Sequence, residues 1–300
     1  MILTQSIAYM ITIGTYMNKL IIIIVFLLAY IVSNGQNTLF GTSNENYGFK
    51  GVFLADDNPY PADSLDTEIA RVYYDFTYRG EKEITGMWLL QVGINTTRFL
   101  PECRYQADSI YRSSNGARLF SYYAKGDPFH FYDSFYITKD KCKFTSRLAA
   151  DDIFYEESIP SISWELLDSE TYICDHLCKE ATGYFRGRTY RVFYTEDIPV
   201  SSGPWKLTGL PGFILHADVD GGKFILRAKQ ILPSTGAPIL WTKYPYVQVS
   251  RKQYMSMLSQ MQQHYFTYFN SHLGRSNVIV RSGKNHIYLD LSWVEQLEIE

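Results

Sequence analysis

Residues 213–231 read FILHADVDGGKFILRAKQI, in which two apolar runs flank Asp220-Gly221-Gly222. Asp and Gly at the centre of so short a connection are typical of a hairpin turn. Strands joined by so few residues can pair only in the antiparallel sense. The stretch therefore predicts strands over 213–219 and 224–231, and it indicates a fold that contains an antiparallel sheet.

Further strand patterns lie on both sides of this hairpin. The run 183–195 alternates, so that Tyr184, Arg186, Arg188, Tyr190, Val192 and Tyr194 would share one face of a single strand. The other predicted strands cover 69–76, 87–92, 129–137, 143–147, 164–167 and 286–291. A turn is predicted at 80–83, and the strand at 87–92 is expected to be buried on both faces.

One long stretch has helical periodicity. From Ser250 to about residue 269, apolar and aromatic residues recur at steps of three and four, and Ser250 is a suitable N-cap. A weaker helical pattern covers 102–112. Many short strands and one such helix predict a mainly β fold: a curved antiparallel sheet, or half-barrel, with one long C-terminal amphipathic helix packed into or beside it.

The N-terminal region has the features of a secretory signal peptide over residues 1–35. An unbroken apolar run at 20–32 follows Lys19 and precedes Ser33-Asn34-Gly35, which predicts cleavage before Gln36. Residues 1–16 contain no Lys or Arg, which makes Met17 a candidate for the true start. A transmembrane anchor is the rival interpretation, because residues 1–32 are mostly apolar and a spanning helix needs about 20 such residues.

The rest of the chain is predicted to be one domain. Residues 36–66 are polar and turn-rich, which indicates a loosely ordered lead-in, and no linker divides 67–300. After cleavage the protein would be exported to the periplasm or the cell surface, and it would not be an integral membrane protein. Charged residues make up 20% of the chain, the net charge is -3, and no basic face is clustered, which argues against a nucleic-acid binder.

Four cysteines are candidates for disulfides, because exported proteins sit in an oxidising compartment. Three pairings are open, and we favour Cys103–Cys142 with Cys174–Cys178. Cys174-Asp175-His176-Leu177-Cys178 resembles half a zinc site, but no second pair at suitable spacing completes it. We therefore expect no metal and no cofactor.

Signals for catalysis are weak. His216 and Asp218 lie two positions apart on one predicted strand and would face the same side. A base with an acid nearby is one requirement of acid–base catalysis. No activated nucleophile, P-loop or Gly-x-Gly-x-x-Gly motif accompanies them. A cross-strand hydrogen-bonding role for His216 is the simpler interpretation. The acidic pairs, among them Glu156-Glu157, are expected on a solvated face.

The segment 173–215 is the most specific part of the sequence. It contains YFRGRTY at 184–190, Ile198-Pro199, and GPWKLTGLPGFIL at 203–215. This pattern resembles the GLPGLI family of exported Bacteroidetes proteins, with Phe213 in place of the usual Leu and Cys174 as an addition. The matching residues are Cys178, Ala181, Phe185, Gly187, Arg188, Ile198, Pro199, Gly203, Pro204, Trp205, Gly209, Leu210, Pro211, Gly212, Ile214 and Leu215.

The resemblance implies an exported protein whose biochemical role is unsettled. It also implies a loose, fold-level likeness to LolA-type lipoprotein carriers, in which a curved sheet wraps an apolar ligand. Ser64 and Ser109 stand in Asp-Ser-Leu and Asp-Ser-Ile, which resemble the O-glycosylation motif of Bacteroidetes envelopes.

The motif itself predicts a stiff crossover over 199–212. Pro204 and Pro211 fix φ, and Gly203, Gly209 and Gly212 permit positive φ. Pro211-Gly212 fits a type II turn, Trp205 and Leu210 would anchor the loop to the core, and Arg188 would pair with Glu196 or Asp197. Either these residues only shape the crossover, or they form a binding loop that presents Arg188, Trp205, Lys206, Leu210, Pro211 and Gly212.

Three functions remain open at this stage. The first is a non-catalytic envelope protein that binds a ligand or partner, such as outer-membrane or envelope machinery or an apolar ligand. The second is a hydrolase whose catalytic residues are unidentified. The third is a purely structural surface protein.

Overall fold

The computed structural model describes residues 40–44, 48–53, 60–80, 83–113, 120–125, 133–148, 151–263 and 296–298. The predicted signal peptide, the predicted strand at 286–291 and the first residues of the strand predicted at 129–137 lie outside these ranges.

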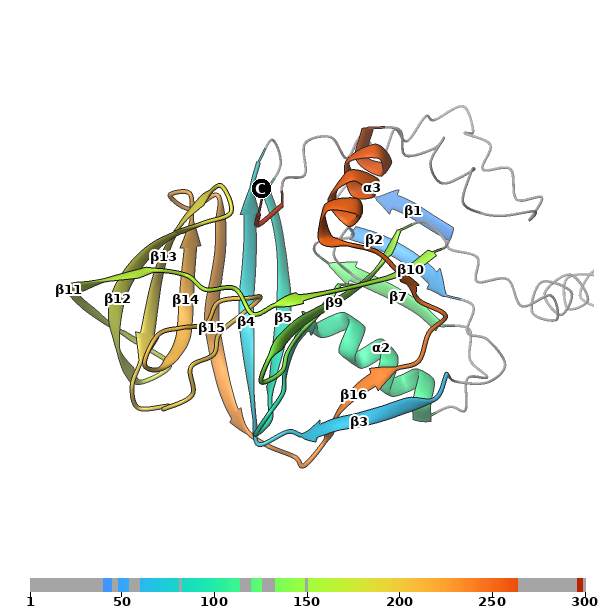
Figure 1. The fold of residues 1–300 in the computed structure, drawn as a ribbon. Helices are drawn as coiled ribbons and strands as arrows, with labels where there is room; N and C mark the ends of the chain where they lie inside the picture. Colours follow the sequence, from blue (N-terminus) through green and yellow to red (C-terminus); the bar gives the residue numbers. More distant parts are fainter. Residues whose placement is uncertain are drawn as a thin grey trace, which may run out of the picture.

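A single large sheet dominates the described chain (Figure 1). Neighbouring strands are antiparallel, except for the parallel pair at the end of the order, and the two edge strands do not pair with each other. The twelve strands follow in the order β11 (Trp164–Ile173), β12 (His176–Phe185), β13 (Arg188–Thr195), β14 (Phe213–Val219), β15 (Phe224–Pro233), β4 (Ala70–Arg79), β5 (Glu83–Val92), β6 (Thr97–Pro101), β8 (Ser134–Ile137), β9 (Lys141–Leu148), β10 (Asp151–Ser158) and β17 (Val247–Gln248). The hairpin predicted around residues 220–222 is confirmed as β14 and β15, with Val219 opposite Phe224.

The run 183–195 was predicted to be one strand, and this is wrong. The chain reverses at Arg186 (φ 45°) and Gly187 (φ 82°), so the run is divided between β12 and β13, with Phe185 opposite Arg188. Two successive residues with positive φ match the twist of a two-residue hairpin. Alternation within β13 is confirmed, because its residues Arg188, Tyr190, Val192 and Tyr194 are buried.

The edge strand β11 is longer than the segment predicted at 164–167. It has ten residues, most of them exposed, and its pairing with β12 shifts register between Leu166 and Glu170. No strand among the described residues pairs with its outer side.

Two small sheets stand apart from the large one. The first contains β1 (Phe40–Asn44), β2 (Gly48–Phe53) and β7 (Phe120–Lys125), and the second pairs β3 (Ala62–Thr67) with β16 (Pro238–Thr242). Three of these strands lie in, or at the end of, residues 36–66, where we predicted a loosely ordered lead-in. Because β2 pairs with β7 and β3 pairs with β16, both distant in the sequence, the local composition does not reveal them.

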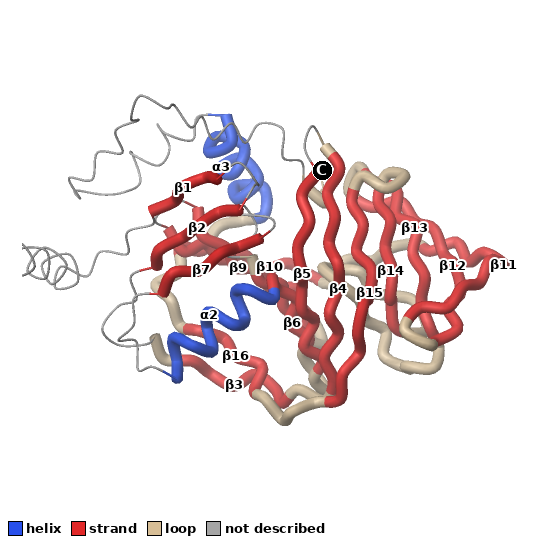
Figure 2. The backbone as a smooth tube through the Cα atoms, turned by 180° about the vertical axis from the view of Figure 1, so that it is seen from behind, coloured by secondary structure: helices blue, strands red, loops and turns tan. Residues whose placement is uncertain are grey.

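Two helices are present in the described chain. The weaker prediction is confirmed as α2 (Glu102–Ser113), which lies beside β5 and β6 (Figure 2). The stronger pattern coincides with α3 (Arg251–Gln263), a helix of 13 residues, whereas the predicted length to about residue 269 is not confirmed, because that end lies beyond the described range. Within the part of the chain that is described, neither helix has the length and apolar character needed to cross a membrane.

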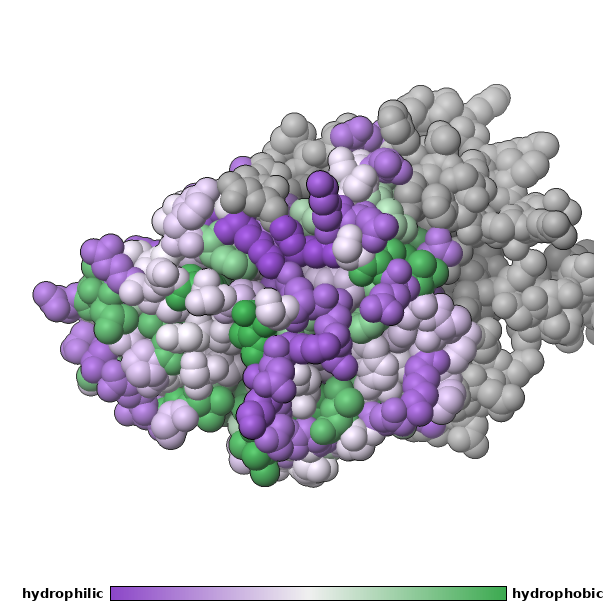
Figure 3. All heavy atoms as spheres, viewed as in Figure 1, coloured by the Kyte–Doolittle hydropathy of each residue, from purple (hydrophilic) through white to green (hydrophobic). Residues whose placement is uncertain are grey.

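Aromatic side chains from both halves of the large sheet form one core. Trp88 stacks on Phe99 with ring centroids 4.8 Å apart, and Tyr254 of α3 packs edge-on against Phe144 at 4.8 Å. The helix therefore covers the β9–β10 end of the core. On the face shown in Figure 3, hydrophobic residues form small areas separated by hydrophilic ones, which is consistent with apolar burial in the interior.

Candidate functional site

The loop between β13 and β14 is packed into the core. Trp205 stacks nearly parallel to Tyr190, with centroids 5.8 Å apart, and Leu210 is only 3% exposed. Both were predicted as anchors, and both are confirmed. Pro211 and Gly209 are exposed, whereas Lys206 has no exposed surface. The loop thus presents few of the side chains that we proposed as a binding surface.

The glycines of this loop act differently from the prediction. Gly209 has φ +94°, as expected, but Gly203 and Gly212 are not among the residues with positive φ. The predicted type II turn at Pro211-Gly212 is therefore wrong, because that turn requires a positive φ at its second central residue. Close approach explains these glycines instead: a Cβ at Gly212 would lie 2.1 Å from the Thr195 carbonyl oxygen, and a Cβ at Gly203 would lie 2.7 Å from the Cβ of Ile214.

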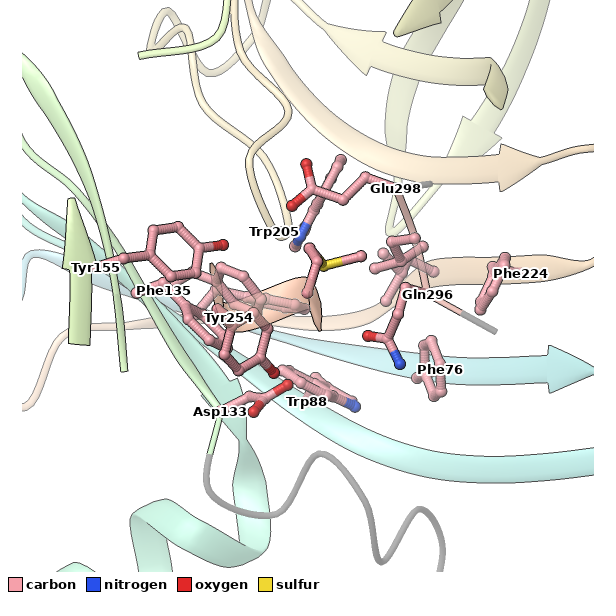
Figure 4. A pocket seen from close by; sticks show the side chains of 15 residues that line it. Phe76, Trp88, Asp133, Phe135, Tyr155, Trp205, Phe224, Tyr254, Gln296 and Glu298 are labelled. Carbon is pink, nitrogen blue, oxygen red and sulfur yellow. The ribbon is translucent and has the colours of Figure 1, made fainter. Parts of the chain in front are cut away.

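Residues of this motif converge on the segment Gln296–Glu298, which lines the same pocket as Trp205 (Figure 4). Arg188 Nε donates a hydrogen bond to the Gln296 carbonyl oxygen at 2.7 Å. The Tyr190 hydroxyl donates to the Leu297 carbonyl oxygen at 2.5 Å. The main chain of the segment is therefore held by two side chains of β13.

Arg188 also contradicts a prediction. Its guanidinium pairs with Asp220 at 2.5 Å, not with Glu196 or Asp197. Asp220 lies in the turn after β14, where burial opposes ionisation but hydrogen bonds from the Thr189 backbone and Arg188 hold the pKa of Asp220 below its usual value. The two acids that we expected as partners of Arg188 pair with other residues: Glu196 pairs with Lys179, and Asp197 pairs with His176.

A buried charge cluster holds the side chain of Glu298. Lys206 Nζ lies 2.8 Å from one carboxylate oxygen of Glu298, and Arg186 Nη1 lies 2.5 Å from the other. Glu157 binds the same two cations, at 2.8 Å from Lys206 and 2.6 Å from Arg186. The Tyr155 hydroxyl adds a hydrogen bond with Lys206 at 3.1 Å, and Arg251 approaches Glu298 at 3.5 Å.

Burial and ion pairing oppose each other in this cluster. Burial by itself raises the pKa of Glu157, but hydrogen bonds and charge from Arg186 and Lys206 outweigh it, so the pKa of Glu157 falls below 4.5. Glu157 is therefore ionised at neutral pH. A buried lysine requires such partners, because an unpaired charge in the interior is costly.

A small apolar pocket adjoins the charge cluster. Its open volume is about 40 Å³, room for about three water molecules. The segment Gln296–Glu298 contributes one wall, and Asp133 lies at its polar side, where it accepts a hydrogen bond from Ser146 at 2.5 Å (Figure 4). Most of the other lining residues are apolar or aromatic: Phe76, Trp88, Phe99, Phe135, Phe144, Tyr155, Trp205, Phe224, Leu226, Tyr254 and Met255.

The predicted disulfides are not formed, and none of the four cysteines is joined to another. Cys142 is fully buried on β9, where burial raises the pKa of its thiol to about 12. Cys103 lies on α2. Cys174 lies in the turn between β11 and β12 with its sulfur 3.5 Å from the Ala228 carbonyl oxygen, whereas the Cys178 sulfur contacts the His176 carbonyl oxygen at 3.5 Å. The thiols of this last pair are thus engaged with different backbone oxygens.

The candidate acid–base pair is not assembled. Asp218 accepts a hydrogen bond from the backbone N–H of Gly222, and His216 packs against Phe193 with centroids 5.8 Å apart. Burial, reinforced by the charge of Arg227, lowers the pKa of His216 to about 4. Its Nδ1 atom is buried and has no hydrogen-bond partner among the described residues, so the expected cross-strand bond is not found.

Ser64 on β3 and Ser109 on α2 are both exposed. No group of three or more His, Cys, Asp or Glu side chains in the described ranges is arranged to hold a metal ion.

Sequence reasoning missed several of the converging residues. Glu157 was expected on a solvated face, but its side chain is largely buried against Arg186, whereas its neighbour Glu156 pairs with Lys141 and Lys143 nearer the surface. Gln296 and Glu298 carried no signal, because their partners Arg188 and Lys206 lie 108 and 92 residues away in the sequence. The one available clue was Lys206 within an apolar stretch, since a buried lysine requires an acid.

Comparison with known proteins gives a short family match and distant structural likenesses. A family described as a protein of unknown function (Porph_ging), which is associated with Bacteroidetes, matches residues 186–216, the stretch that contains Arg186, Arg188, Tyr190 and Lys206. No curated protein matches.

Among solved structures, the chain is similar to PNGF-II in space group P21, with 12% identity and a TM-score of 0.46 over 64% of this chain and 33% of that one. It is similar to PNGF-II in space group C2 with 14% identity and a TM-score of 0.48 over 65% of this chain and 33% of that one. It is also similar to an uncharacterized conserved protein from Thermus thermophilus, with 9% identity and a TM-score of 0.33 over 60% of this chain and 90% of that one. The chain thus spans about a third of the length of PNGF-II.

Proposed function

We propose that this protein is an exported, non-catalytic component of the bacterial cell envelope, of the GLPGLI type, that binds a partner at the site around Gln296–Glu298. The observation that carries this proposal is the convergence of Arg186, Arg188, Tyr190 and Lys206 on the segment Gln296–Glu298. These residues belong to the stretch matched by a Bacteroidetes-associated family of unknown function, which supports a role for the site beyond this one chain.

The chemistry of the site favours binding over catalysis. Lys206 and Arg186 are both engaged by Glu157 and Glu298, so neither is placed as a free acid or base. His216, the candidate base, lies on β14 against Phe193 and does not meet Arg188, which pairs with Asp220. A hydrolase would need a nucleophile with an activating base in contact.

An apolar ligand is a second candidate, favoured by the aromatic lining of the pocket. Its volume of about 40 Å³ is far below the several hundred Å³ that drug-sized ligands occupy. A larger ligand would therefore enter only if Gln296–Glu298 moved aside. A carrier role like that of LolA-type proteins would require this apolar ligand.

Site-specific photo-crosslinking in the native cell tests the proposal. Met255 lines the pocket, and Gln260 is exposed on the other side of α3, so a photoreactive phenylalanine at each gives a matched pair. We expect a discrete protein adduct from position 255 and none from 260. Lipid adducts at 255 would favour the apolar ligand, and equal or absent adducts at both positions would leave only a structural role.

Export is tested separately, by N-terminal sequencing of the protein from cell envelopes. The mature chain is expected to begin at Gln36. A chain that begins upstream of Leu20, or that is found in the cytosol, would contradict the export part of the proposal.

A further inference from the structure

We infer that the site recognises a peptide in which a leucine-like residue is followed by glutamate, and that Gln296–Glu298 occupies it as an internal stand-in that a partner segment replaces. This inference rests on the proposed function and names the chemistry of the partner.

The backbone of the segment is recognised first. Arg188 and Tyr190 donate to two successive main-chain carbonyl oxygens, those of Gln296 and Leu297, at 2.7 and 2.5 Å. Hydrogen bonds to main-chain carbonyl oxygens can form with a peptide of any sequence, so they give affinity and leave the choice of sequence to the side-chain pockets. The segment therefore lies in this site as a bound peptide would.

The glutamate position supplies the charge requirement. Glu298 is only 5% exposed, and its two oxygens are bound by Lys206 and Arg186. With Arg251 at 3.5 Å, three cations face the two carboxylates of Glu157 and Glu298. A peptide without an acid at this position would leave buried cations short of a counter-charge, which is unfavourable.

The leucine position is less restrictive. Leu297 packs against the aromatic core and lines the pocket, where about 40 Å³ beside it is unfilled. Phe, which is larger than Leu, and Met, which has a similar volume, are therefore expected to be accepted at this position. The glutamate that follows determines which peptides bind, and the apolar residue determines how far the peptide enters the pocket.

Attachment to the same chain favours the internal segment. A segment of the same chain competes with a free peptide at a raised effective concentration, so a free peptide binds the wild-type protein weakly. Weakening the internal segment should expose the site without altering the residues that form it. Substitutions in the segment are therefore more informative than substitutions in the receptor residues, which would weaken both the internal and the external peptide.

The experiment uses the full mature chain with Leu297→Ala and Glu298→Gln together. The probe is a fluorescent hexapeptide with the sequence of residues 294–299, VEQLEI, and the control probe carries Gln in place of the glutamate that corresponds to 298. Anisotropy should show the first probe binding the double variant at least tenfold more tightly than the wild type, and at least tenfold more tightly than the control probe. Equal binding of the two probes, or no gain in the double variant, would overturn the inference.

Matched controls keep the outcome interpretable. Glu165→Gln, an exposed acid on β11, should leave probe binding at the wild-type level. If circular dichroism shows that the double variant is unfolded, Glu298→Gln alone is measured, with the same expected direction. A persistent protein adduct at position 255 together with probes that do not discriminate would reject the inference and leave the proposed function in place, whereas loss of both would reject both.

Discussion

Lys206 is the residue on which the buried cluster depends most. It has no exposed surface, and its ammonium group is shared by Glu157 and Glu298. Lys206→Met keeps the apolar stem but leaves two buried carboxylates with fewer cations. We expect a loss of about 3–5 kcal/mol in the free energy of unfolding, measured by urea denaturation at pH 7. Lys179→Met, at an exposed pair with Glu196, is the control, and a comparable loss there would contradict the argument.

His216 predicts how stability varies with pH. Because burial lowers its pKa from 6.5 to about 4, the unfolded chain takes up a proton at a higher pH than the folded protein does. The stabilisation from the neutral imidazole is complete above pH 6.5 and is lost as the pH falls towards 4, by up to about 3 kcal/mol. The free energy of unfolding, plotted against pH between 7 and 4, should vary less for His216→Gln than for the wild type. The same dependence of unfolding free energy on pH in the wild type and in His216→Gln would contradict this role of His216.

At the scale of the element, α3 begins with a reciprocal pair of hydrogen bonds. The Ser250 hydroxyl accepts from the Gln253 N–H at 3.2 Å, and the Gln253 side chain accepts from the Ser250 N–H at 2.7 Å. This is a capping box, so Ser250→Ala should cost about 1 kcal/mol in urea denaturation. Ser256→Ala, at an exposed position inside the same helix, should be neutral or slightly stabilising. Equal effects of the two substitutions would show that the cap contributes nothing.

Elements with a strong local pattern were predictable, and those fixed by distant partners were not. The alternation in β13 and the turn after β14 identify their strands because each property is local. The reversal at Arg186 was missed because an arginine with positive φ is uncommon. Likewise, Trp205 could be recognised as an anchor from its type, whereas the partners of Lys206 depend on which strands the fold brings together.

At the scale of the whole molecule, Cys142 reports on the opening of the large sheet. It is fully buried on β9, so its reaction with a thiol reagent requires the surrounding core to open. We expect all four thiols to react in denaturant and Cys142 to react far more slowly than Cys103 in the native protein. Fewer than four reactive thiols in denaturant would reveal a disulfide and contradict the structure, in which none of the four cysteines is joined to another.

The outer side of β11 bears on how copies of this molecule behave when they are crowded. The strand carries Glu165, Asp168 and Glu170 and no Lys or Arg, and its ladder is interrupted by the register shift after Leu166. Two copies that met edge to edge would set like charges against each other along an irregular backbone. Such a rim disfavours edge-to-edge pairing of two copies through β11, the longest edge strand in the described chain.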